Sequence, residues 1–224
     1  METWLALLAA YLWGGFPTAY LVARWKAGID LRRVGSGNVG AANVAQALGA
    51  RMGILVGFFD ALGKGTLPLV IARAVGLSPW QQMGVGLALV AGHNWSPYLR
   101  FTGGRGVATS LGVLLGASLP GIPLELWGMA LVVAPGWLAR RSTAFWVGIG
   151  FLSLPLWALI VPGRPRLWLA VGLLGLMVLK RLLANWERPG NRYPWTKVLL
   201  WRLLYDRDVP PGEPWQERGI TRRS

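Results

Sequence analysis

Residues 4–23, WLALLAAYLWGGFPTAYLVA, form an uninterrupted stretch of 20 residues without a charged side chain. About 20 predominantly apolar residues are what an α-helix needs to cross the hydrocarbon core of a bilayer. The stretch is longer than the apolar region of a cleaved signal peptide and lacks the basic segment that precedes one, so we expect it to remain as a transmembrane helix. This stretch predicts a membrane protein built from helices.

The rest of the chain has the same character. Hydrophobic residues make up 54% of the sequence and charged residues 14%, whereas soluble domains carry roughly 25% charged residues. Further apolar runs predict an all-α polytopic membrane protein with about seven transmembrane helices, near residues 3–23, 52–73, 79–99, 106–119, 121–138, 142–161 and 164–184. The fourth run is short, and Pro120-Gly121 predicts its turn into the fifth. A single broken span at that point would leave six.

The basic residues favour seven spans. Nineteen Lys and Arg residues fall on one predicted side, against three on the other (Arg73, Arg164 and Arg166), and Lys64 lies within a helix. Because cytoplasmic loops are enriched in Lys and Arg, the N-terminus is expected outside and the C-terminus in the cytoplasm. Six spans would place Arg140 and Arg141 outside.

The composition also bounds the domain organisation and the partners. The net charge of +14 lies in short loops and near the C-terminus, so we expect membrane lipids, and no nucleic acid, as its partner. Residues 1–205 are predicted to form one membrane domain, which ends in an interfacial helix after Pro194, and residues 206–224 a flexible basic tail. With no cysteine and one histidine, we expect neither a cofactor nor a metal site.

The segment 92–109, GHNWSPYLRFTGGRGVAT, carries the only histidine, His93, and the turn Gly103-Gly104-Arg105-Gly106 before a new helix. Such a turn exposes backbone N–H groups, adds a guanidinium and directs a helix N-terminus at its ligand, which is typical of a phosphate site. An imidazole beside it can accept or donate a proton near neutral pH. A lone histidine near a helix end is more often a packing residue.

Two further segments carry polar residues next to the apolar runs. The loop 35–43, GSGNVGAAN, combines three glycines with Ser36, Asn38 and Asn43, and it is either a ligand-binding loop or a flexible loop with a helix cap. The segment 180–190 ends the last apolar run and contains Asn185, which membrane anchoring does not require.

The apolar runs also contain charged residues. Asp60 and Lys64 lie four residues apart in the second run, so they can neutralise each other, either as a structural pair or as part of a site. Glu125 lies near the outer end of its run and is expected to be structural.

In order and spacing, these segments resemble one family, the bacterial acyl-phosphate-dependent glycerol-3-phosphate acyltransferases. The resemblance rests on 36–43, on 92–97 with 101–109, on 185–188 and on 59–65, and it covers essentially residues 1–205. It implies transfer of an acyl group from acyl-phosphate to the 1-hydroxyl of glycerol 3-phosphate, which gives lysophosphatidic acid and phosphate. It also implies a multi-pass protein of the bacterial inner membrane that associates with other enzymes of phospholipid synthesis.

The resemblance, together with the chemistry above, assigns the candidate site residues. The expected catalytic residues are His93, Ser36 and Asn185. The expected substrate-binding residues are Asn38, Asn43, Gly103, Gly104, Arg105, Gly106, Thr109, Asp60, Lys64 and Arg188.

The sequence also departs from the family pattern. Ala42, Gln46 and Leu182 stand where the family usually has threonine, arginine and histidine, and Arg105 replaces a lysine. The spacing from Asp60 to Lys64 is one residue longer than usual. These departures favour the alternative of a non-catalytic or altered-specificity paralogue. A transporter of an anionic lipid or metabolite is a further alternative, against which the lack of an internal repeat counts.

Overall fold

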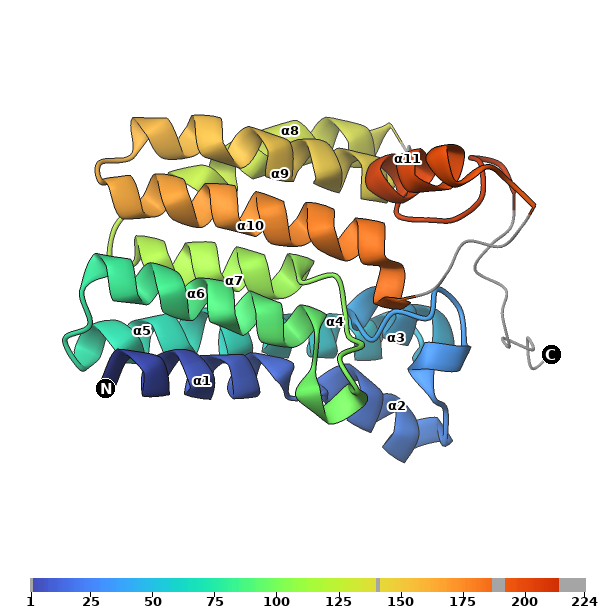
Figure 1. The fold of residues 1–224 in the computed structure, drawn as a ribbon, viewed down its shortest axis with the longest axis horizontal. Coiled ribbons are helices and arrows are strands. Elements are labelled where there is room, and N and C mark those ends of the chain that lie inside the picture. The colour runs from blue at the N-terminus through green and yellow to red at the C-terminus, as the bar shows by residue number, and fades with distance from the viewer. Residues whose placement is uncertain (1, 140–141, 187–191, 214–224) are drawn as a thin grey trace.

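The computed structural model describes residues 2–139, 142–186 and 192–213 (Figure 1). In these ranges the regular elements are helices, and most of them lie side by side along one long axis. The long stretches are α1 (Glu2–Gly15) with α2 (Thr18–Ala27), α4 (Ala50–Phe58) with a π-helix (Phe59–Thr66) and α5 (Leu67–Ala74), α6 (Pro79–Asn94), α7 (Val107–Ser118), α8 (Leu124–Leu138), α9 (Thr143–Ile160) and α10 (Arg164–Leu183). The shorter helices are α3 (Ala41–Leu48), α11 (Trp195–Tyr205) and 3₁₀ turns at Leu31–Arg33, Pro97–Leu99 and Ala184–Trp186.

Each predicted apolar run corresponds to one of these helical stretches, which confirms the all-α membrane fold. Three of them, Thr3–Ala27, Ala50–Ala74 and Thr143–Ile160, are long and apolar enough to cross a bilayer. The turn predicted at Pro120-Gly121 separates α7 from α8. The number of spans and their orientation stay predictions.

Two predicted helices differ from the structure. The first run divides at Phe16-Pro17 into α1 and α2. The third was expected to reach residue 99, but α6 ends at Asn94, and Trp95 leaves the helical conformation (φ −130°, ψ 72°). Pro97, which cannot donate a backbone hydrogen bond, then begins a short 3₁₀ turn. A loop that contains this 3₁₀ turn therefore follows α6.

The second long stretch contains a π-helix at its centre, Phe59–Thr66, and this segment carries Asp60 and Lys64. A π-helix holds more residues per turn than an α-helix and is often found at functional sites. The π-helix carries both residues without breaking the long helix.

The helices pack closely through glycines, as is common in membranes. A Cβ atom on Gly92 of α6 would collide with the Tyr11 carbonyl of α1, and one on Gly112 of α7 would collide with the Ala61 carbonyl of the π-helix. Large apolar side chains such as Ile54, Leu131 and Leu156 instead point outward and are more than 60% exposed. The outer surface is therefore apolar.

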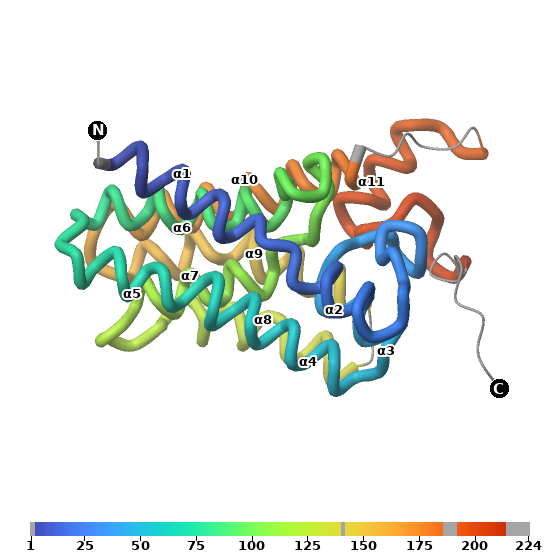
Figure 2. The backbone as a smooth tube through the Cα atoms, turned by 90° about the horizontal axis from the view of Figure 1, so that it is seen from below, coloured from blue at the N-terminus to red at the C-terminus, as the bar shows by residue number. Residues whose placement is uncertain are grey.

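The two ends of the bundle differ. Figure 2 shows the N-terminus and the connection from α5 to α6 at one end, and α2, α3 and α11 at the other. We call the latter the loop end. Among the described residues, most Lys and Arg side chains belong to elements at the loop end, whereas Arg73 lies in the last turn of α5 and Arg164 and Arg166 at the start of α10, which Figure 1 shows at the opposite end. This distribution agrees with the charge split in the sequence.

Candidate active site

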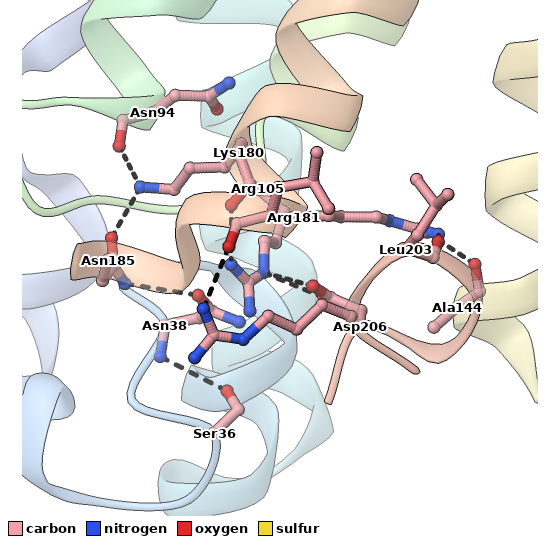
Figure 3. A network of polar contacts seen from close by, with 12 residues as sticks. Ser36, Asn38, Asn94, Arg105, Ala144, Lys180, Arg181, Asn185, Leu203 and Asp206 are labelled. Atoms are coloured by element: carbon pink, nitrogen blue, oxygen red, sulfur yellow. Dashed lines mark hydrogen bonds and ion pairs between the residues drawn. The ribbon is translucent and has the colours of Figure 1, made fainter. Parts of the chain in front are cut away.

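The three loop segments singled out in the sequence meet at the loop end, where Figure 3 shows them joined by side-chain hydrogen bonds. Asn185 lies at the centre. Its Oδ1 accepts a hydrogen bond from Gly103 N at 3.0 Å, and its Nδ2 donates to Gly103 O at 3.2 Å and to Asn38 Oδ1 at 3.4 Å. One asparagine therefore links the loop 35–43, which we call the first loop, the glycine-rich turn and the end of α10.

The backbone explains how Asn185 reaches this position. Ala184 and Asn185 both adopt left-handed conformations, with φ of 42° and 57°. Asparagine tolerates this region better than most residues. The chain therefore turns sharply after α10 and presents the Asn185 side chain to Gly103.

Lys180, in the last turn of α10, contacts the side chain of Asn185. Its side chain is fully buried, and its Nζ donates to Asn185 Oδ1 at 2.5 Å and to the carbonyl of Asn94 at the end of α6. The Trp95 ring lies 5.5 Å from the same ammonium. From the sequence alone, Lys180 is expected only to anchor the end of the last span.

The glycine-rich turn packs directly on His93. Gly104 N donates to His93 O at 3.1 Å, and a Cβ atom on Gly104 would collide with His93 Nε2. The first two N–H groups of the turn thus bond within the protein, because Gly103 N is taken by Asn185. Within the turn, Arg105 and Gly106 line the large cavity at the loop end.

Asp60 and Lys64 form an ion pair close to His93. Lys64 Nζ is 2.7 Å from Asp60 Oδ1, and both side chains are buried. Both residues and His93 line a cavity of about 10 Å³, which is close to the volume that one water molecule occupies. Asp60 and His93 also line the large cavity at the loop end. The pair is therefore both internally neutralised and part of the site.

The first loop is held by Asn43, whose Nδ2 lies 3.0 Å from each of three backbone carbonyls, those of Leu31, Val34 and Asn38. Ser36 Oγ accepts a bond from Asn38 N at 3.4 Å, and Val39 N donates to Gly103 O at 3.2 Å. Asn43 shapes the loop with its amide nitrogen, while its Oδ1 has no hydrogen-bond partner among the described residues.

The loop end contains a cavity of about 1030 Å³ that is partly open to the outside, and we call it the chamber. Its polar lining comprises Ser36, Asn38, Asn43, Asp60, His93, Arg105, Arg181, Tyr205, Asp206 and Arg207, and its apolar lining includes Val107, Ala108, Leu111, Val147 and Met177. The chamber thus offers both charged groups and an apolar wall made by α7, α9 and α10. Such a lining suits an amphipathic substrate with an anionic head and an apolar chain.

Residues after α10 complete this chamber, and the sequence alone does not predict their part in it. Arg105 Nε is 2.8 Å from Asp206 Oδ1, and Arg181 donates to Leu203 O and Ala144 O at 2.6 Å each. Residues 206–213, predicted to belong to a flexible tail, thus include Asp206 paired to the turn and Pro211 in the chamber lining. Residues 214–224 lie outside the described residues.

The remaining sequence predictions have different outcomes. Thr109 is fully buried on α7 and lies outside the chamber lining, and its Oγ1 has no described hydrogen-bond partner. Glu125 is buried and pairs with Arg166, which also donates to Ser118 Oγ at 2.7 Å, so its expected structural role agrees with its contacts. Arg188 lies outside the described residues.

The fold and the chamber together define an integral membrane protein with a cationic site at one end of its helix bundle. The family model of glycerol-3-phosphate acyltransferases matches residues 4–191, and the chain belongs to this family.

Curated relatives match over most of their length. Glycerol-3-phosphate acyltransferase 5 of Dehalococcoides mccartyi is 40% identical over 223 residues, covering 94% of this chain and 91% of the relative. Glycerol-3-phosphate acyltransferase of Thermus thermophilus is 44% identical over 195 residues, covering 81% of this chain and 92% of the relative.

Two solved structures have the same fold. Both are crystal structures of PlsY, an integral membrane glycerol 3-phosphate acyltransferase, and each covers 89% of this chain. The glycerol 3-phosphate form has a TM-score of 0.72 with 33% identity and 99% of its own chain covered. The lysophosphatidic acid form has a TM-score of 0.70 with 32% identity and 100% covered.

Proposed function

We propose that the protein transfers a fatty acyl group from acyl-phosphate to the 1-hydroxyl of glycerol 3-phosphate at a bacterial inner membrane. The hydroxyl oxygen forms a bond to the acyl carbonyl carbon, and the bond from that carbon to the phosphate oxygen breaks. The products are lysophosphatidic acid and inorganic phosphate, which carries away the hydroxyl proton. The chemistry requires no covalent enzyme intermediate, because phosphate is a good leaving group.

The single observation that carries this proposal is the chamber at the loop end. It brings Arg105, His93 and the Ser36 loop to the same space as the apolar faces of α7 and α10. Positioning two substrates next to each other and stabilising negative charge are the largest contributions that a protein can make to acyl transfer. The relatives and the solved structures are named glycerol-3-phosphate acyltransferases, which supports the acceptor and the acyl transfer.

The residues have separate roles in this proposal. Arg105 and the start of α7 bind a phosphate group, and Ser36 and Asn38 orient the glycerol phosphate. His93 is the polar side chain next to the reacting hydroxyl. Asn185 holds the turn on which Arg105 lies.

The test uses purified protein in detergent with palmitoyl-phosphate and glycerol 3-phosphate. We expect release of phosphate and formation of lysophosphatidic acid in equal amounts. Phosphate release without lysophosphatidic acid would identify a hydrolase or an altered acceptor. The absence of both, in protein that is monodisperse on size exclusion, would favour the non-catalytic paralogue.

The donor is tested separately with palmitoyl-CoA. The phosphate-binding part of the site is a compact turn, and the chamber is lined by helices and short loops of the membrane domain. We therefore expect turnover with palmitoyl-phosphate and none with palmitoyl-CoA. Equal turnover with both donors would contradict the proposed donor and leave the acceptor unaffected.

A further inference from the structure

We propose that Arg207 is a phosphate-binding residue of this site, contributed by the segment 192–213. That segment lies beyond residue 191, where the match to the family model ends. The inference rests on the proposed function, because it names a further group that binds one of the two phosphorylated substrates.

The segment that carries Arg207 contacts the helix bundle before this residue and is held to α11 after it. Before it, Arg202 Nη1 donates to Leu182 O at 2.9 Å. Directly before it, Asp206 pairs with Arg105. Directly after it, Asp208 accepts two bonds from Arg202, at 2.6 Å and 2.8 Å. Arg207 is therefore held in place beside the glycine-rich turn.

The surroundings of Arg207 leave part of its guanidinium group unsatisfied. Arg207 lines the chamber, and its guanidinium lies 5.7 Å from the ring of Tyr205, which itself stacks on Phe145 of α9. Its Nε is buried without a hydrogen-bond acceptor among the described residues. A buried donor without an acceptor is unfavourable, and a phosphate oxygen in the chamber is the kind of acceptor that a guanidinium binds best.

The charges around the chamber also favour an anionic ligand. Each of its two lining acids is paired, Asp60 with Lys64 and Asp206 with Arg105. Among the described residues, no carboxylate lies within ion-pair distance of Arg181 or Arg207. Arg181 directs two of its nitrogens to backbone carbonyls. The chamber therefore has surplus positive charge, which Arg207 can direct to an anion.

Glycerol 3-phosphate and acyl-phosphate share the phosphate group that Arg207 would bind. The experiment compares Arg207→Ala and Arg207→Lys with the wild type, by varying each substrate in turn. We expect Arg207→Ala to raise KM at least tenfold for the substrate whose phosphate it binds and to change KM for the other less than threefold. Arg207→Lys should recover part of the loss, because the charge remains.

Arg192→Ala is the matched control. Arg192 belongs to the same segment, but its side chain is 74% exposed, pairs with Glu213 and lies outside the chamber lining. We expect wild-type kinetics. Values of KM in Arg207→Ala that equal those of Arg192→Ala for both substrates would overturn the inference.

A binding measurement separates this inference from the proposed reaction. Glycerol 3-phosphate or inorganic phosphate should raise the Tm of the detergent-purified wild type, and Arg207→Ala should shift this response to at least tenfold higher ligand concentration. If the wild type binds in this way but does not turn over acyl-phosphate, the donor proposal fails and Arg207 stands. An unchanged response in a folded Arg207→Ala protein overturns Arg207 alone.

Discussion

The carboxamide of Asn185 forms two hydrogen bonds with Gly103, one to its N–H and one to its carbonyl, at 3.0 Å and 3.2 Å. These two residues are 82 positions apart in the chain. The same Oδ1 also accepts a bond from the buried Lys180. Asn185 therefore sets the position of the glycine-rich turn relative to α10.

Replacing Asn185 should affect activity through the position of this turn. Asn185→Ala leaves the ammonium of Lys180 and the N–H of Gly103 without one acceptor each, and an unsatisfied buried group costs about 1–3 kcal/mol. We expect kcat/KM to fall by about tenfold or more and the Tm to decrease. Asn185→Asp keeps the acceptor and should retain more thermal stability than Asn185→Ala. Equal Tm values for the two variants would contradict the role of Oδ1.

Substitution of Gly104 should disturb His93. A Cβ atom at residue 104 would lie 2.8 Å from Val39 O and would collide with the imidazole. We expect Gly104→Ala to lower kcat by about tenfold or more, as a displaced reacting group does. Gly175→Ala, on α10, has no atom within 4 Å of the new Cβ and serves as the control with wild-type kinetics. Full activity of Gly104→Ala would show that His93 can move without consequence.

Arg105 and Asp206 should behave as a coupled pair. Arg105→Ala removes a charged partner of the phosphate, for which roughly 1.5–3 kcal/mol corresponds to about a ten- to a hundredfold loss in kcat/KM. Arg105→Lys should be the mildest change at this position, because lysine also binds phosphate.

The same prediction extends to Asp206 by a double-mutant cycle. Arg105→Ala leaves the Asp206 carboxylate unpaired where an anion must bind, so Arg105→Ala with Asp206→Asn should be more active than Arg105→Ala alone. Strict additivity of the two changes in steady-state kinetics would show that the pair is not coupled.

The orientation of the bundle is tested with reporter fusions. Among the described residues, the basic side chains concentrate at the loop end, and the positive-inside rule predicts that this end faces the cytoplasm. Fusions after residues 77, 140 and 190 should therefore report outside, inside and inside. A periplasmic signal after residue 190 would contradict the seven-span topology.

Apolar length and turn residues were sufficient to predict most of the fold. The helix ends near Ser118 and Leu183 fall within one residue of those expected. The π-helix was not predicted, because apolar periodicity over a few residues does not distinguish it from an α-helix. The early end of α6 is not predicted either, because the apolar run continues past Asn94 while the helical backbone conformation ends there.

The sequence predicts those site residues whose polar side chains a membrane-spanning helix does not require. Ser36, Asn38, His93 and Asp60 all line the chamber or its neighbouring cavity. Lys180 was not predicted, because a basic residue at the end of a span is expected from topology alone. Its partner carbonyl at Asn94 is 86 residues away, and such a contact has no signature in the local sequence.

The chamber draws its walls from both ends of the chain, from Ser36 near the start to Pro211 near the end. During synthesis, the first loop emerges long before α11 does. A nascent chain therefore carries no complete substrate site until its last helical stretch has been inserted and the segment after it has docked. Assembly of this protein in the membrane and the onset of its activity should thus be a single event, completed only after Pro211 has been made.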